Sequence, residues 1–126
     1  MERIGRALNR MTAKWRNEPC PIDVVVEDVG LDLTAYGVDG RLISTPGHTA
    51  GSLSVVLGDG TVLVGDLVRG KPGKLSLGMF CEDRVASLDS LEAVVALAPR
   101  VVHMSHGTSV GVAELESFIA SARKVK

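Results

Sequence analysis

Apolar residues recur along this chain with two different periods, and the two periods predict where helices and strands form. Near the N-terminus, Ile4, Leu8, Met11 and Trp15 follow one another at spacings of four, three and four residues. This spacing gives one apolar face to a helix over residues 2–16. The same period predicts two further helices, over residues 83–98 and 111–124.

Short runs rich in valine and leucine predict the strands, at residues 22–27, 31–33, 41–44, 53–57, 61–64 and 101–104. The sequence Gly58-Asp59-Gly60 lies between two of these runs and predicts a hairpin, because glycine adopts the backbone conformations that tight turns need. Residues 70–78 contain Pro72 and Gly73 and predict a flexible loop. Strands that concentrate ahead of two helices are typical of an α+β fold with a mainly antiparallel sheet.

Several of the predicted strands are apolar on both faces, as in Val55-Val56-Leu57 and Val62-Leu63-Val64. This pattern indicates a sheet that is covered on both sides, and the chain's own helices cover one of them. If about ten side chains of the other face stayed in water, the lost burial at ~1.5 kcal/mol each would be about 15 kcal/mol. Because that is comparable with the whole stability of a domain, we expect a partner chain to cover this face. The simplest partner is a second copy, which makes a homodimer.

Composition narrows the classes of function. The 126 residues are enough for one domain. The 14 Lys and Arg balance the 15 Asp and Glu without a basic stripe, so we expect no nucleic-acid partner. No run reaches the ~18 to 20 apolar residues that cross a bilayer, and the N-terminus has no apolar signal core, so we expect a cytoplasmic protein with no membrane partner. Cys20 and Cys81 lack metal-binding spacing and are expected to be reduced thiols.

Candidate metal ligands stand in three loops that directly follow strand-like runs. The loops are Ser44-Thr45-Pro46-Gly47-His48-Thr49-Ala50-Gly51-Ser52, Val64-Gly65-Asp66 and Met104-Ser105-His106-Gly107. Loops at strand ends are where a rigid scaffold can aim functional side chains. At these residues the sequence resembles the second half of the metallo-β-lactamase superfamily domain. The HxHxDH loop, with which that family supplies the other half of a two-metal site, has no counterpart here.

This resemblance implies a role for each of three residues. The histidine of the Pro-Gly-His-Thr loop binds the first metal in the family, which points to His48. The aspartate of the Gly-Asp turn bridges both metals, which points to Asp66, and the late His-Gly histidine binds the second, which points to His106. Two imidazoles and one carboxylate match an open zinc site. With the other ligands absent, we expect zinc to bind weakly or partially.

Each of these residues could also have a structural role that needs no metal. His48 could be a hydrogen-bonding remnant of an ancestral site, Asp66 could cap a turn, and His106 could be a polar residue beside a helix. His103 lies in the middle of a predicted strand and is expected to be a satisfied core or interface histidine. We expect Thr49 and Ser52 to hold the shape of the His48 loop through hydrogen bonds to the backbone.

The resemblance thus implies half of an αββα sandwich, with a mainly antiparallel sheet, helices on one face and a partner chain on the other. We predict that residues 1–126 are a single truncated metallo-β-lactamase-like half-domain. It forms a homodimer, retains half of the metal site and is not a competent hydrolase alone. Its catalytic residues and its small-molecule substrate stay unassigned.

The alternative is a zinc-dependent hydrolase whose site is completed by a second chain or by a missing N-terminal half. A small-ligand binding module is a third reading. The metal content of the purified protein separates the non-catalytic half-domain from the zinc-dependent hydrolase.

Overall fold

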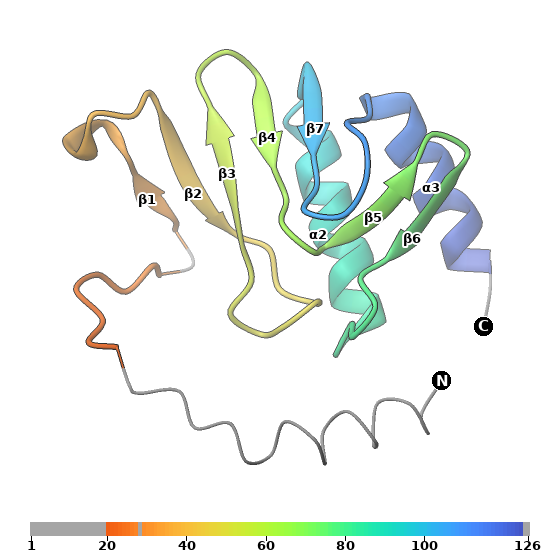
Figure 1. Ribbon diagram of the computed structural model, residues 1–126, viewed down its shortest axis with the longest axis horizontal. Helices are drawn as coiled ribbons and strands as arrows, with labels where there is room; N and C mark the ends of the chain where they lie inside the picture. Colours follow the sequence, from red (N-terminus) through yellow and green to blue (C-terminus); the bar gives the residue numbers. More distant parts are fainter. Residues whose placement is uncertain (1–19, 28, 125–126) are drawn as a thin grey trace.

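The main sheet has five strands in the order β1-β2-β3-β4-β7 (Figure 1). The computed structural model describes residues 20–27 and 29–124, so the helix predicted for residues 2–16 lies outside the described residues. Strands β1 (Leu31–Asp32), β2 (Gly40–Ser44), β3 (Leu53–Leu57) and β4 (Thr61–Leu63) pair antiparallel in succession. Strand β7 (Val101–His103) pairs parallel with β4. The α+β class is confirmed, with a mixed sheet in which antiparallel pairs predominate.

The direction of the strands decides where the loops gather. Because β2 and β4 are each antiparallel to β3, and β7 is parallel to β4, the strands β2, β4 and β7 all run the same way. Their C-terminal ends therefore lie at one edge of the sheet, the lower edge in Figure 1. The three loops that carry the candidate ligands follow these three ends.

The predicted hairpin between β3 and β4 is present, and its turn also holds β7 in place. Gly60 has a φ of +81°, which favours glycine. The Asp59 carboxylate accepts a hydrogen bond from the Thr61 backbone N–H at 2.8 Å and one from Arg100 Nη2 at 2.9 Å. The bond from the Thr61 backbone, followed by the Thr61 side chain and Arg100, holds the pKa of Asp59 below its ordinary value. Arg100 immediately precedes β7, so this contact places β7 beside β4.

Helices α2 (Arg84–Ala96) and α3 (Val112–Lys124) cover one face of the sheet, close to the bounds predicted from the sequence (Figure 1). Asp83 caps α2 by accepting two backbone N–H bonds at 2.9 Å. Arg123 of α3 bonds to Glu92 and Asp89 of α2, which raises the pKa of Arg123. No helix among the described residues is long and apolar enough to cross a membrane. The core between sheet and helices contains Val62, Leu88, Leu91, Val94, Val102 and Leu115.

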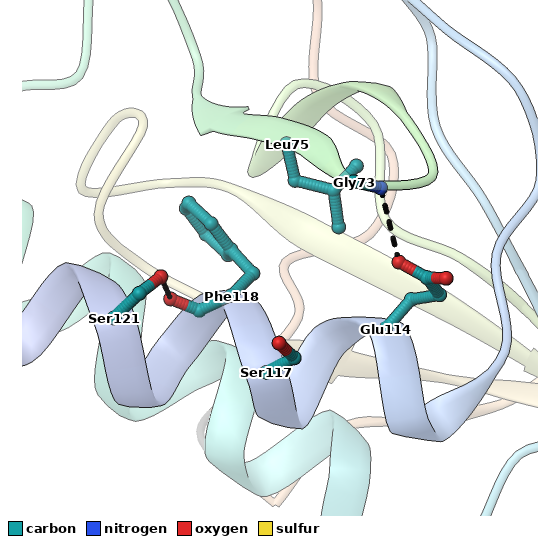
Figure 2. A pocket seen from close by; sticks show the side chains of 6 residues that line it. All are labelled: Gly73, Leu75, Glu114, Ser117, Phe118 and Ser121. Carbon is teal, nitrogen blue, oxygen red and sulfur yellow. Dashed lines mark hydrogen bonds between the residues drawn. The ribbon is translucent and has the colours of Figure 1, made fainter.

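Residues 70–78 are not the flexible loop that the sequence predicted. Strands β5 (Val68–Lys71) and β6 (Lys74–Leu77) form an antiparallel hairpin whose turn is Pro72-Gly73. Proline followed by glycine favours a tight turn, and Gly73 has the positive φ, +73°, that such a turn uses. Figure 2 shows the hairpin held against α3, where Glu114 Oε2 accepts a hydrogen bond from the Gly73 backbone N–H at 3.2 Å. The cavity of about 110 Å³ between them contains no histidine or aspartate.

The face of the sheet away from the helices is largely apolar. Register places Leu42 opposite Val55, Val55 opposite Leu63, and Leu63 opposite His103. Neighbouring Val62 and Val102 are buried against the helices, so this row lies on the opposite face, since side chains alternate along a strand. Leu63 is 39% exposed. We call this surface the open sheet face.

The prediction of a strand at residues 22–27 is wrong. The structure gives this segment no strand, and Ile22 and Val25 are among its exposed apolar side chains. In Figure 1 the segment runs away from the main sheet. Valine-rich sequence favours an extended chain, but a strand also needs a hydrogen-bonded neighbour, and the segment pairs with none of the strands described.

Candidate metal site

His48, Asp66 and His106 line one cavity of about 360 Å³ at the C-terminal edge of β2, β4 and β7. His48 Nε2 lies 3.9 Å from Asp66 Oδ2, and His106 Nε2 lies 3.5 Å from Asp66 Oδ1. The structure therefore brings together all three residues that the sequence singled out. Asp66 lies between the two histidines.

The loop that carries His48 is fixed against the start of α2. Gly47 has a φ of +138°, and a Cβ at this position would lie 2.5 Å from Ser87 Cα. Only glycine allows so close an approach. The Gly47 carbonyl accepts a bond from the Asp83 backbone N–H at 2.9 Å, and the Pro46 carbonyl accepts one from Ser90 Oγ at 2.7 Å. These contacts fix the backbone directly before His48, and so the point from which its side chain extends.

Hydrogen bonds within the loop confirm the role predicted for Thr49 and Ser52. The Thr49 backbone N–H donates to Ser52 Oγ at 3.0 Å, and the two hydroxyls are 2.9 Å apart. Glu82 adds a contact that the sequence did not reveal. Its carboxylate accepts from the Ala50 N–H at 3.2 Å, and its own N–H donates to the His48 carbonyl at 3.1 Å. No local motif indicates this pairing, because it joins loops far apart in the sequence.

The loops of Asp66 and His106 are joined through their backbones. The Ser105 N–H donates to the Gly65 carbonyl at 2.9 Å, directly before Asp66. The Gly70 N–H donates to the His106 carbonyl at 2.9 Å. A Cβ at Gly107 would overlap the Gly70 carbonyl, so glycine is needed here as well. The backbone that carries both side chains is thus held by hydrogen bonds.

Two buried atoms of this cluster bear on whether it suits a metal. Asp66 Oδ1 and His48 Nδ1 are buried and have no hydrogen-bond partner among the described residues. An unsatisfied buried polar atom costs about 1–3 kcal/mol, and a cation would offset that cost at Asp66 Oδ1. Because Oδ1 has no partner, this atom does not cap the turn.

The donor set fits zinc by type, since imidazole and carboxylate are both common zinc ligands. The separations fit less well. In the part of the chain that the structure describes, no three His, Cys, Asp or Glu side chains are grouped closely enough to hold an ion. His48 Nδ1 also lacks the acceptor that usually orients a metal-bound histidine. The cluster therefore has the composition of a zinc site without its closed geometry.

The sequence did not single out Arg69, Met79 and Phe80, which line the same cavity. Met79 is 63% and Phe80 53% exposed. Exposed apolar side chains that gather beside a cavity are typical of ligand-binding grooves. In the sequence they follow a segment that looks like a loop, so nothing local marked them.

His103 lies outside this cavity, and the prediction of a core position for it is wrong. Its side chain is exposed, and Nδ1 is 2.6 Å from Ser109 Oγ. Val102 occupies the buried position on β7, so alternation turns His103 to the open sheet face. Whether His103 belongs to an interface stays a prediction.

Comparison with known proteins gives matches to β-lactamase-like proteins. No protein-family model matches the sequence. A Drosophila melanogaster protein named β-lactamase-like protein 2 homolog is 27% identical over 90 residues, which are 70% of this chain and 29% of the relative. Among solved structures, a metallo-β-lactamase from Erythrobacter litoralis with β-mercaptoethanol in its active site is 20% identical with a TM-score of 0.69. The match covers 93% of this chain and 54% of that one.

The metallo-β-lactamase FIM-1 of Pseudomonas aeruginosa, solved in its mono-zinc form, is 23% identical with a TM-score of 0.63. That match covers 92% of this chain and 52% of the other. The chain thus spans about half the length of these solved proteins and less than a third of the curated relative. These matches confirm the resemblance at the level of structure: this chain has the fold of part of a metallo-β-lactamase domain.

Proposed function

We propose that residues 1–126 form a metallo-β-lactamase-like half-domain that retains half of a metal site and is not a competent hydrolase by itself. The observation that carries the proposal is the convergence of His48, Asp66 and His106 on one cavity, in a sequence with no HxH or DH pair. Without the other half of the ligand set, no group identified here positions an attacking water.

The residues that would hold zinc are His48, Asp66 and His106. When bound, zinc polarises a substrate carbonyl or phosphoryl group and lowers the pKa of a bound water. The chain's own contribution is the Asp66 carboxylate, whose Oδ1 accepts no hydrogen bond from the described residues, and two imidazoles that approach it from separate loops. Binding is weak in this proposal because nothing among the described residues orients the His48 ring through Nδ1.

The proposal includes a homodimer formed through the open sheet face. Its support is the apolar row of Leu42, Val55 and Leu63 on the side of the sheet opposite the helices. Two sheets that pack face to face bury such rows against each other. A second copy offers an identical apolar face, so a two-fold arrangement covers both at once.

The oligomeric state tests this part directly. Light scattering on the purified chain should give the mass of a dimer at micromolar concentration. Leu63→Lys places a charge on the open sheet face and should yield monomers or aggregates. Val85→Lys is the matched control, because Val85 is 62% exposed on α2, on the other side of the sheet. A well-folded monomeric wild type would contradict the homodimer.

The alternative function is a zinc-dependent hydrolase completed by a second chain or by an N-terminal half. It is favoured by the cavity itself, whose volume of about 360 Å³ lies within the range of small-molecule sites. Assays of the purified chain with a β-lactam, a thioester and a phosphodiester separate the proposal from an alternative in which a second copy of this chain completes the site. We expect the purified chain to turn over each substrate more slowly than about 1 per second, a rate that ordinary enzymes reach. Faster turnover that a chelator abolishes would favour the alternative.

A further inference from the structure

The small cavity between the β5–β6 hairpin and helix α3 shares no residue with the candidate metal site (Figure 2). Its volume of about 110 Å³ is below the roughly 300–1,000 Å³ of drug-sized pockets, so it suits a group as small as one side chain. Its lining residues are Gly73, Leu75, Glu114, Ser117, Phe118 and Ser121. Among these lining residues, the one charged side chain is that of Glu114.

The two lysines of the hairpin extend from its other face. Register pairs Gly70 with Leu75 and Lys71 with Lys74. Leu75 lines the cavity and packs against the core, so Lys74 and Lys71 lie on the opposite face, because side chains alternate along a strand. In the described part of the chain, no cation comes within ion-pair distance of Glu114. The charge of Glu114 is available to a ligand.

The polar side chains of the cavity come from one side of α3. Glu114, Ser117 and Ser121 follow one another at spacings of three and four residues, which places them on the same helix face. Figure 2 shows Glu114 and Phe118 reaching toward the hairpin, with Ser117 between them. The bond from the Gly73 N–H to Glu114 Oε2, at 3.2 Å, restrains the carboxylate beside the cavity. A carboxylate only accepts hydrogen bonds and a hydroxyl also accepts them, so this pair suits a ligand that donates.

The middle of the cavity is apolar. Leu75 lines it from the hairpin and Phe118 from α3, and both side chains are partly buried against the core. A hydrocarbon chain that lies on them is removed from water, which favours its binding. Ser121 lies one turn beyond Ser117, and its hydroxyl already donates to the Phe118 carbonyl at 2.8 Å. An acid at one end and apolar side chains beside it favour a cation on a short hydrocarbon chain.

We propose that this cavity binds a primary ammonium group on a short alkyl chain. The ammonium lies between the Glu114 carboxylate and the Ser117 hydroxyl, and the alkyl part lies against Leu75 and Phe118. An ammonium group donates three hydrogen bonds, and its bond to a carboxylate is charge-assisted. A free small amine and the side chain of a lysine both carry this group. The inference goes beyond the proposed function, because no residue of the metal cluster takes part in it.

Binding of simple amines to the full chain tests the inference. We would titrate the protein at neutral pH with n-butylammonium and with the uncharged 1-butanol, and follow the backbone amide signals by NMR. Butylammonium should bind about tenfold more tightly than butanol, because its bond to the carboxylate is charge-assisted. It should shift the signals of Gly73 and of residues 114–121. Equal affinities, or shifts confined to other residues, would overturn the inference.

A third probe, Nα-acetyl-lysine amide, distinguishes the two sources of the ammonium group. It presents the lysine side chain as a polypeptide does. Tighter binding of this probe than of butylammonium identifies the ligand as a lysine side chain, and tighter binding of butylammonium identifies it as a small amine. If neither probe binds more tightly than butanol, the cavity does not recognise an ammonium group and the inference is wrong.

Variants assign the binding to the cavity. Glu114→Gln removes the charge and keeps an oxygen that accepts from the Gly73 N–H, so the hairpin should stay in place. It should weaken butylammonium binding about tenfold, while Glu116→Gln, at an exposed glutamate of α3 outside the cavity, should leave the Kd unchanged. Ser117→Leu, also at an exposed position, fills the cavity without a change of charge and should abolish binding.

Thermal unfolding of each variant shows whether the fold is intact. If Glu114→Gln is damaged, Ser117→Leu decides alone. Affinity equal to that of the wild type in a folded Glu114→Gln or Ser117→Leu variant would place the amine elsewhere and contradict the inference.

Discussion

Gly47→Ala should destabilise the fold because a methyl group has no room at this position. The glycine has a φ of +138°, and the new Cβ would lie 2.5 Å from Ser87 Cα. Backbone strain at such a φ costs about 1–3 kcal/mol for a non-glycine residue. Relief of the overlap requires the loop to move away from α2. That movement would break the bond from the Asp83 N–H to the Gly47 carbonyl, worth about 1 kcal/mol more. The free energy of unfolding should fall by about 2–4 kcal/mol.

Urea denaturation followed by circular dichroism measures this change, and Gly51→Ala supplies the control. Gly51 belongs to the same loop, yet nothing lies within 4 Å of a Cβ there. Its substitution should alter the free energy of unfolding by less than about 0.5 kcal/mol. If the two alanine variants unfold at the same urea concentration, the His48 loop does not pack tightly against α2. The position of His48 then does not depend on the glycine at residue 47.

Three further predictions follow from single contacts. Gly78→Ala places a Cβ over the Asp66 carbonyl oxygen and 2.7 Å from His48 Nδ1, so it should displace both residues and weaken zinc binding more than Gly51→Ala does, as measured by competition with a zinc indicator. Asp83→Ala removes the cap of α2 and should cost about 1 kcal/mol in thermal unfolding, whereas Asp83→Asn should retain most of the stability. The bond from the Thr61 N–H lowers the pKa of Asp59, so this carboxylate stabilises the fold above its ordinary pKa of 3.8 and the contribution is lost as the pH falls through the lowered pKa. Asp59→Asn should therefore show a shallower loss of stability than wild type in acid denaturation below about pH 4.

Local patterns in the sequence predict much of this fold. The turn at Gly58-Asp59-Gly60, the two helices and the three ligand loops each depend on residues within a few positions of one another, so one sequence suffices to find them. The Pro72-Gly73 hairpin was missed although its turn signal is local. Its strands combine Arg69, Gly70 and Lys71 with few apolar residues and look like a loop.

What the sequence did not predict depends on register and on distant contacts. Val56 and Leu63 both belong to apolar runs, but only register shows that Val56 packs toward the helices while Leu63 lies on the open sheet face. A shift of one residue would exchange the two faces. A cavity lined by Arg69 and Arg84 likewise combines strand β5 with the first residue of α2, and no short motif records that combination.

Zinc content under controlled substitution tests the central claim most directly. Elemental analysis after dialysis should find less than one zinc per chain. His48→Ala, Asp66→Ala and His106→Ala should each lower that content, while His103→Ala, at a histidine outside the cavity, should leave it unchanged. Stoichiometric zinc that survives both His48→Ala and His106→Ala would show that the metal binds elsewhere and would contradict the assignment of the site.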